Sequence, residues 1–427
     1  MSEPALPSGF DGVLAEAAPL AAVFHDAGFR LYLVGGVVRD HLMGIQHAGQ
    51  DLDATTDARP EEIKRLVAGL AEAVWTQGER FGTIGCRIDG RPYEITTHRA
   101  DAYDESSRKP VVSFGDHIED DLARRDFTVN AMAVDLRDRR LVDPHDGRGD
   151  LERLILRTPL DPEVSFSDDP LRMLRAARFH ATYGLVPVEP LTSAIAEMGD
   201  RMAIVSAERV RDELEKLLLL DRAGEGLRLL HSTRLLGRVI EALDGIAAGE
   251  VELLGRRVEA QAVLAGPRWA ALLFDARPVA ASLGPLRPSG RLTREVTWLI
   301  GDRTWLDSVP HDPPAIRRAA SASPVGHVIE NRLDFFAALR MGDEASGGDI
   351  VAAREATAAL RTAEPDLDNP RPVLSGDVVC GLLDLSPGPD VGVALGWLAE
   401  QRIIEGPLDP DDAKERLLEW WKSRPQP

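Results

Sequence analysis

The pattern of apolar and polar positions divides the chain into a mixed first third and a helical remainder. Apolar residues recur at helical spacing over residues 11–28, and a short apolar run at 31–34 predicts a buried strand. The same pattern predicts further strands at 74–76, 83–88 and 91–97, and helices at 37–43, 60–67, 206–220, 223–236 and 251–264. We therefore expect an α+β chain whose strands lie near the beginning.

A pair of glycines stands between the first strand and the helix that follows it. Gly35 and Gly36 allow a tight turn and a close approach to a ligand, and Arg39 lies on the helix. A helix start leaves free N–H groups, which suit a phosphate. The motif is neither a P-loop nor the dinucleotide fingerprint, since G-x-x-x-x-G-K-[ST] and G-x-G-x-x-G are both missing.

Two aspartates follow this bend, at Asp51 and Asp53. In a strand, residues two apart point to the same side, so both carboxylates can face one ligand. Mg²⁺ prefers oxygen ligands and is commonly shared between one or two carboxylates and substrate phosphates. A Gly-Gly pair or an Asp-x-Asp alone is an ordinary turn or strand end. Their order along the chain points to metal-assisted phosphoryl transfer.

Composition narrows the classes of protein that remain. The 427 residues carry a net charge of −20, which argues against non-specific coating of RNA but leaves room for a local arginine-lined groove. No apolar run approaches the ~20 residues that span a bilayer, and no secretory signal is visible. With only two cysteines, a disulfide scaffold and a cysteine zinc site are excluded. We expect a cytoplasmic protein.

GGVVRD followed by DLD resembles the signature of class II tRNA nucleotidyltransferases and bacterial poly(A) polymerases, within the polymerase-beta nucleotidyltransferase superfamily. The resemblance implies a polymerase-beta-like mixed sheet with flanking helices, followed by an all-α neck, body and tail. The corresponding boundaries are 1–150 for the catalytic head, 151–222 for the base-recognising neck, 223–345 for the body and 346–427 for the tRNA-binding tail. It also suggests Glu94 as a third carboxylate; the alternative is a cross-strand partner for an arginine.

The block RRDFTVNA strengthens the resemblance. Arg124 and Arg125 beside a metal-bound phosphate would form a sensible charge clamp, and Asn130 belongs to the same block. The alternative is a surface arginine paired with Asp120 or Asp121. Residues 101–115 are polar, with no period until VVSF, and predict a mobile loop. In the family such a loop helps to switch between nucleotides, and its length here favours an enzyme that adds the terminal A.

A second block, SDDPLRMLRAARF, carries Asp168 and Asp169 before an arginine-rich helix. Asp169, Arg172, Arg175 and Arg178 recur every three residues and are expected along one side of that helix. An Asp–Arg pair on a rigid helix can hydrogen-bond the edge of a base. The resemblance implies that this motif selects ATP and CTP by side chains instead of a template. The alternative is a ladder of salt bridges along the helix, which is disfavoured because too few acids lie nearby to pair with the arginines.

Signals weaken after residue 220. Many relatives carry a metal-dependent HD phosphohydrolase domain here, but Phe274 stands before Asp275 where they have histidine, so we expect no phosphohydrolase activity. Several arginines of the body are candidates for a tRNA-facing surface, although solvated faces are the more usual fate of such residues. These are Arg287, Arg291, Arg294, Arg317, Arg318, Arg332 and Arg340.

The resulting hypothesis is template-independent addition or repair of the 3′-terminal CCA of tRNA, from CTP and ATP, with release of pyrophosphate. Asp51 and Asp53 would hold Mg²⁺ with help from Glu94, and the tRNA would be held by its 3′ end and its acceptor and elbow region. Gly35, Gly36 and the arginines of the first two motifs would bind the triphosphate. Three alternatives stay open: a poly(A) polymerase, an enzyme that adds only A, and a non-catalytic tRNA-binding protein.

Overall fold

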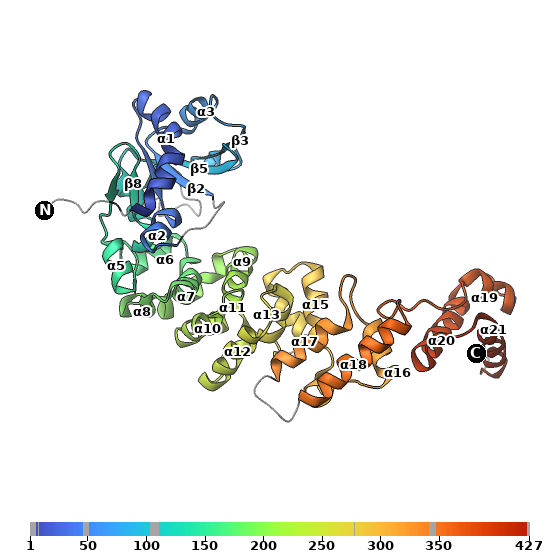
Figure 1. Cartoon of the computed structure of the whole chain (residues 1–427). Helices are drawn as coiled ribbons and strands as arrows, with labels where there is room; N and C mark the ends of the chain where they lie inside the picture. The colour runs from blue at the N-terminus through green and yellow to red at the C-terminus, as the bar shows by residue number, and fades with distance from the viewer. Residues whose placement is uncertain are drawn as a thin grey trace. The chain divides into compact units, whose positions relative to one another are not determined.

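The computed structural model describes residues 6, 8–45, 51–102, 111–276, 278–340 and 347–424. The chain forms two compact units, one of residues 1–213 and 225–239, the other of residues 214–224 and 240–427 (Figure 1). The first unit combines a sheet with helices and the second is helical, which confirms the α+β class. The four-part division into head, neck, body and tail stays a prediction. None of the described helices is long and apolar enough to cross a membrane.

A seven-stranded sheet forms the centre of the first unit, in the order β3-β4-β5-β2-β1-β8-β9. Its strands are β1 (Leu31–Val34), β2 (Leu52–Thr56), β3 (Ala73–Trp75), β4 (Thr83–Ile88), β5 (Arg91–Thr97), β8 (Ala133–Asp135) and β9 (Arg140–Val142). All neighbours are antiparallel except β2 and β5, which run parallel. Parallel neighbours need a crossover, and residues 57–90 provide it with one helix and a two-stranded excursion.

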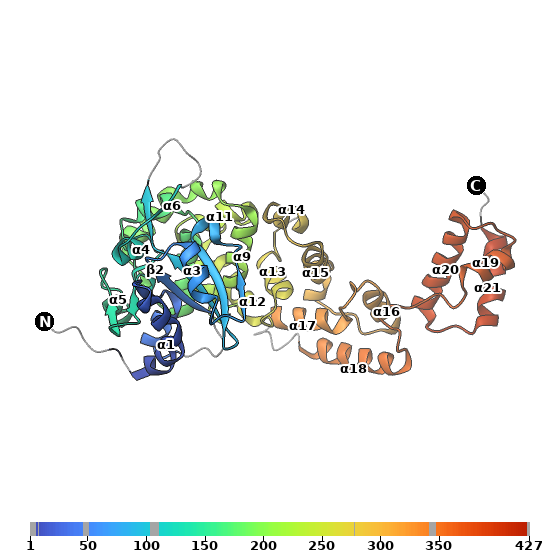
Figure 2. The same cartoon turned by 90° about the horizontal axis from the view of Figure 1, so that it is seen from above.

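Two helices, α1 (Asp11–Asp26) and α3 (Pro60–Val67), pack on the sheet and define its core face. Both helices lie beside the sheet in Figures 1 and 2. Alternation along β5 shows why: Tyr93 and Ile95 are buried, whereas Glu94 between them is exposed. The apolar stripe of α1 meets this face through side chains such as Leu20 and Phe24, both fully buried. The other face is thereby left to polar residues such as Glu94.

The predicted loop at 101–115 is partly wrong. β6 (Arg99–Ala102) and β7 (Val111–Phe114) pair as an antiparallel hairpin, and residues 103–110 lie outside the described part of the chain. The first strand was missed because the apolar positions of Arg99–Ala102 are alanines, which give only a weak strand signal. The remaining small pair is β10 (Ile155–Leu156) with β11 (Val186–Pro187).

Besides α1 and α3, the chain up to residue 239 forms more helices than the pattern predicted. They are α2 (Gly36–Leu42), α4 (Ile118–Ala123), α5 (Gly147–Arg153), α6 (Pro162–Asp168), α7 (Arg172–Tyr183), α8 (Glu189–Met198), α9 (Ala207–Leu218), α10 (Ala223–Ser232) and α11 (Leu235–Val239). Pro170 separates α6 from α7, so Asp169 has extended backbone and lies outside the arginine helix. The expectation that Asp169 shares a helical face with Arg172 is therefore wrong.

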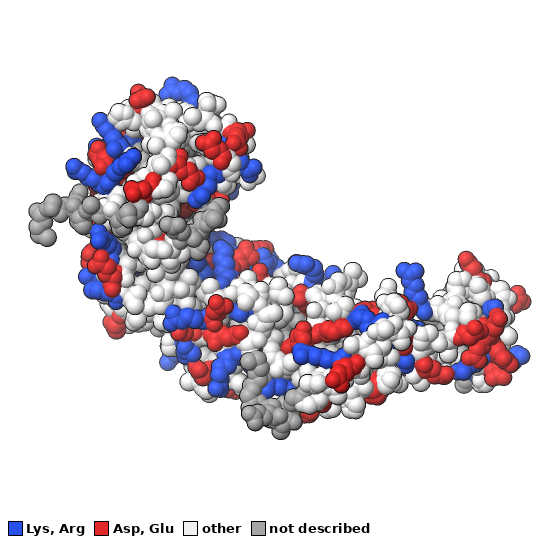
Figure 3. Space-filling view, viewed as in Figure 1, with Lys and Arg blue, Asp and Glu red and all other residues white. Residues whose placement is uncertain are grey.

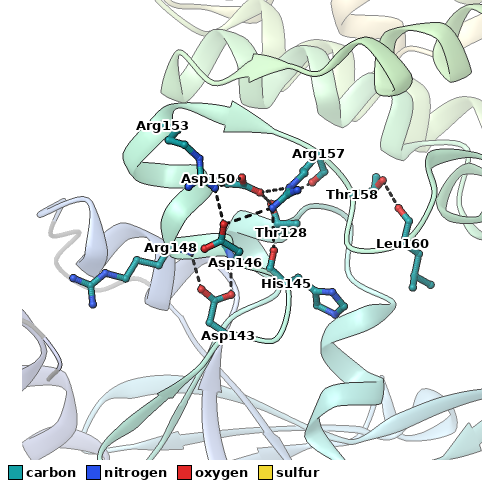
Figure 4. A network of polar contacts seen from close by, with 11 residues as sticks. Thr128, Asp143, His145, Asp146, Arg148, Asp150, Arg153, Arg157, Thr158 and Leu160 are labelled. Carbon is teal, nitrogen blue, oxygen red and sulfur yellow. Dashed lines mark hydrogen bonds and ion pairs between the residues drawn. The ribbon is translucent and has the colours of Figure 1, made fainter. Parts of the chain in front are cut away.

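A polar network ties the RRDFTVNA block to α5 (Figure 4). Thr128 Oγ1 donates to Asp150 Oδ2 at 2.6 Å, and Asp150 also accepts from Arg157 Nε at 2.6 Å. Asp143 accepts from the backbone N–H of Gly147 at 2.7 Å, at the start of the same helix. Asp150 is fully buried and needs these donors, since an unpaired buried carboxylate would be costly. The network fixes the segment that carries Arg125 against the helical part of the unit.

The second unit is built from helices throughout its described residues. They are α12 (Ala248–Ala260), α13 (Ala265–Leu272), α14 (Val279–Leu283), α15 (Gly290–Ile300), α16 (Pro313–Ser321), α17 (Ile329–Leu339), α18 (Gly347–Ala363), α19 (Gly376–Leu383), α20 (Pro389–Glu405) and α21 (Pro410–Ser423). Phe274 is fully buried and packs on Phe335 and Phe336, so this position belongs to an aromatic core.

Three of the body arginines proposed to face tRNA are buried instead. Arg317 pairs with Glu364, and Arg340 pairs with Asp349. Arg332 is 6% exposed and lies over the ring of Trp305, with the guanidinium carbon 4.4 Å from the ring centroid. The expectation was wrong for these three because tertiary packing buries them against an acid or an aromatic ring. In Figure 3 the C-terminal helices show mainly acidic side chains on the visible face.

Candidate active site

The glycine bend brings three separate segments into contact. Gly35 directly follows β1, and its φ of 70° and ψ of −130° suit glycine alone among the common residues. A Cβ atom there would lie 3.1 Å from Arg125 Nη1 and 3.9 Å from Asp53 Oδ2. The bend therefore allows a guanidinium and a carboxylate to meet over the end of the strand.

Three carboxylates lie on or directly next to β2 and β5. Asp53 lies on β2, Asp51 precedes that strand by one residue, and the parallel register places Glu94 of β5 directly opposite Asp53. Burial raises the pKa of Asp53 to about 6; the charge of Arg125 opposes this, and the charges of Glu94 and Asp51 add to it. Asp53 is still exposed as a residue, so protein surrounds its carboxylate without sealing it from water.

This set of donors fits a divalent cation that arrives with a phosphate. In the described part of the chain no group of three or more His, Cys, Asp and Glu side chains could hold a metal by itself. Two aspartates can, however, hold Mg²⁺ when substrate phosphates and water complete the shell. Like charges around Asp53 are the physical sign that a cation is favoured here, because they already raise its pKa.

Arg125 is the best-placed cation of the site. Its Nη2 donates to Asp121 at 3.0 Å, while its Nη1 lies beside the glycine bend. Its Nε is buried and has no hydrogen-bond partner among the described residues. A half-buried guanidinium with an unused donor suits an anionic ligand. The alternative prediction of an ion pair with Asp120 or Asp121 is thus confirmed for Asp121. This ion pair leaves the Nε of Arg125 without a hydrogen-bond partner among the described residues.

Arg39 and Asn130 lie deeper than predicted. Arg39 is 6% exposed; its Nε donates to Asp40 at 2.8 Å and its Nη1 to Asn130 Oδ1 at 2.6 Å. Its guanidinium also lies over the ring of Tyr183, 4.3 Å from the centroid. These contacts bind α2 to α7 and leave direct contact with a triphosphate as a prediction.

The arginines of α7 have acidic or carbonyl partners, so the expected shortage of acids is wrong. Arg175 donates to Asp126 through Nε at 2.9 Å, and Arg178 pairs with Glu213 of α9. Both acids are buried. The sequence interpretation missed them because they lie 49 and 35 residues away from their partners.

The residues predicted to recognise a base lie at the start of α7. Arg172 donates to Ser165 Oγ at 2.8 Å and to the carbonyl oxygen of Arg124, and it has no carboxylate among these hydrogen-bond partners. Asp169 accepts from Arg209 Nη2 at 2.7 Å. The structure thus joins the two arginine motifs through Arg124 and Arg172. Asp168, the last residue of α6, is exposed.

Comparison with known families places this geometry in a class. Residues 31–157 match the poly A polymerase head domain, and residues 189–246 match the probable RNA and SrmB-binding site of polymerase A. With the sheet, the glycine bend and the paired aspartates described above, these matches make the chain similar over these residues to class II tRNA nucleotidyltransferases and bacterial poly(A) polymerases.

Individual relatives narrow the likeness to CCA-adding enzymes. The chain is 40% identical over 228 residues to the CCA-adding enzyme of Geobacillus kaustophilus, covering 53% of this chain and 54% of that one. It is 38% identical over 224 residues to that of Lactobacillus helveticus, covering 52% and 54%. These matches span about half the length of the curated relatives. The crystal structure of the Bacillus stearothermophilus CCA-adding enzyme in complex with CTP superposes with a TM-score of 0.75 at 25% identity, covering 98% of both chains.

Proposed function

We propose that this chain is a CCA tRNA nucleotidyltransferase, which builds or repairs the 3′-terminal CCA of tRNA from CTP and ATP without a nucleic-acid template. The observation that carries the proposal is the register of Asp53 with Glu94, next to a glycine bend occupied by Arg125. The identity of about 40% to CCA-adding enzymes over about half of the chain supports it. Such an enzyme would work in the cytoplasm, where tRNA is processed.

In the proposed reaction the 3′-hydroxyl of the tRNA attacks the α-phosphorus of the nucleotide. A bond forms between the 3′-oxygen and the α-phosphorus, the bond from the α-phosphorus to the oxygen that bridges to the β-phosphate breaks, the hydroxyl proton passes to water and pyrophosphate leaves. Asp51 and Asp53 would hold Mg²⁺, which when bound supplies Lewis-acid stabilisation of the phosphate charge. Arg125 neutralises phosphate oxygens at the bend, and Arg124 belongs to the same clamp.

Selection of the nucleotide is assigned to Asp169 and Arg172. A carboxylate accepts from an exocyclic amino group, and a guanidinium donates to a ring nitrogen or carbonyl oxygen. Both side chains would have to exchange their present partners, Arg209 and Ser165, for the base. Arg175 and Arg178 are held by buried acids, so their role is to position α7.

The test is an incorporation assay with two RNA substrates. One tRNA transcript lacks CCA and the other ends in CC; each receives CTP alone, ATP alone or both, in the presence of Mg²⁺. Addition of three nucleotides to the first transcript supports the proposal. Addition of A only to the second indicates an A-adding enzyme, and long A tails indicate a poly(A) polymerase. Binding of tRNA without incorporation by the wild type would leave the non-catalytic alternative.

A further inference from the structure

A row of four residues crosses the sheet from the glycine bend to its far edge. Asp53 on β2 is opposite Glu94 on β5, Glu94 is opposite Gly85 on β4, and Gly85 is opposite Trp75 on β3. Residues in direct register project from the same face of a sheet. With roughly 4.8 Å between strands, the backbone of Trp75 lies about 10 Å from that of Glu94 and about 14 Å from that of Asp53.

The glycine in this row shapes a pocket. A Cβ atom on Gly85 would lie 1.8 Å from Trp75 Nε1, so the indole lies across the glycine, on the side toward Glu94. A pocket of about 330 Å³ opens there, and its lining includes Trp75, Phe81, Glu94 and Arg99. That volume falls at the lower end of the range of about 300–1,000 Å³ typical of small-ligand sites. Glu94 belongs both to this pocket and to the carboxylate site.

The chemistry of the pocket suits one unpaired nucleotide. Phe81 is 43% exposed, which is unusual for a phenylalanine in a packed domain, and Arg80 lies over its ring, 4.5 Å from the centroid. Aromatic faces stack on bases of any identity, and neighbouring arginines attract the RNA backbone. A structural role for Trp75 as a cover for Gly85 explains the indole but leaves the exposed ring of Phe81 unexplained.

Position decides which nucleotide would occupy this pocket. Arg125 and the glycine bend lie on the β1 side of Asp53, whereas the pocket lies on its β5 side. In-line transfer requires the attacking oxygen and the leaving pyrophosphate to lie on opposite sides of the phosphorus. We propose that the pocket formed by Trp75, Phe81 and Gly85 holds the terminal base of the RNA 3′ end and thereby presents its hydroxyl to the carboxylates. This rests on the proposed function.

The experiment compares two RNA hairpins that mimic the tRNA acceptor end. One ends in an ordinary nucleotide, and the other ends in a ribose that lacks its base but keeps its 3′-hydroxyl. For wild type we expect the KM of the baseless RNA to be roughly 5- to 150-fold higher, as the loss of one stacked base implies. In Phe81→Ala the KM of the ordinary RNA should rise to a similar value, so that the two RNAs become nearly equivalent. The KM for CTP should stay within about twofold.

Two further variants act as controls. Phe81→Tyr keeps an aromatic face and should retain the preference for the ordinary RNA. Val74→Ala changes the neighbour of Trp75 on β3, which is 42% exposed and does not line the pocket, and this variant should behave as wild type. Retained preference in Phe81→Ala, or a rise in the KM for CTP instead of RNA, would overturn the assignment. The proposed function itself fails only if wild type extends neither RNA, and in that case the assignment falls with it.

Discussion

The ion pair between Asp126 and Arg175 offers the sharpest quantitative test of how the head is joined to α7. Asp126 is 8% exposed and accepts from Arg175 Nε at 2.9 Å and from Asn130 Nδ2 at 2.9 Å. Burial alone would raise its pKa, but the charge of Arg175 and these hydrogen bonds outweigh burial and hold the pKa at about 2. The substitution Asp126→Asn keeps the shape and removes the charge.

The expected loss follows from that pKa. The pKa of Asp126 falls from 3.8 to about 2 on folding. At ~1.36 kcal/mol per unit, this corresponds to about 2.5 kcal/mol of stability at neutral pH. Because the folded pKa lies below the unfolded one, the contribution is complete above about pH 4 and disappears as the pH falls toward 2. The gap between wild type and Asp126→Asn should therefore be constant from pH 6 to 8 and should shrink at pH 3.

Urea unfolding at several pH values measures this gap. The matched control is Asp116→Asn, which removes a surface ion pair with Arg59. The carboxylate side chain of Asp116 is 73% exposed. We expect that variant to lose no more than about 1 kcal/mol, as surface pairs do. Equal stability of Asp126→Asn and wild type at pH 7, or a gap that persists unchanged at pH 3, would refute the reasoning.

Three further substitutions test other parts of the structure. Asp53→Asn should abolish nucleotide incorporation. In metal-free protein the same substitution should raise the unfolding free energy by about 1 kcal/mol at pH 8 and by less at pH 5. The reason is that the pKa of Asp53 in the folded protein, about 6, makes its charged form unfavourable, while contact with solvent reduces the full effect. Gly35→Ala should lower stability by about 1–3 kcal/mol and raise the KM for CTP, whereas Gly44→Ala, at the similar φ of 71° but in open space, should show the backbone strain without the KM effect. Glu364→Gln, between two buried arginines of the second unit, should cost about 3–5 kcal/mol in urea unfolding, and the exposed Glu400→Gln far less. Normal stability of Glu364→Gln, unchanged KM in Gly35→Ala, or residual incorporation by Asp53→Asn would each contradict its prediction.

Much of the sheet could be predicted because its signals are local. The strands at 31–34, 83–88 and 91–97 and the helix at 60–67 were predicted with the bounds that the structure has. Short apolar or alternating runs and a proline at a helix start mark such elements without any knowledge of the fold. The Asp-x-Asp pair and its glycine bend are likewise contiguous in sequence, and so the candidate site could be found at all.

Ion pairs and strand pairings between residues far apart along the chain could not be predicted from the sequence. The arginines of α7 looked unpaired, because Asp126 and Glu213 reach them only through tertiary contacts. The hairpin strand at 99–102 lacks a local pattern, and only its partner strand completes it. The alignment of Trp75 with Glu94 depends on two strand registers, which short-range patterns do not determine.

The single parallel pair in the sheet separates two properties that evolution could alter independently. Because β2 and β5 hydrogen-bond directly, the alignment of their carboxylates does not depend on the length of residues 57–90 between them. That intervening excursion contributes the indole and phenyl rings of the pocket. Under the proposed function, exchanging this one segment between homologues should alter RNA preference and leave the carboxylate register unchanged.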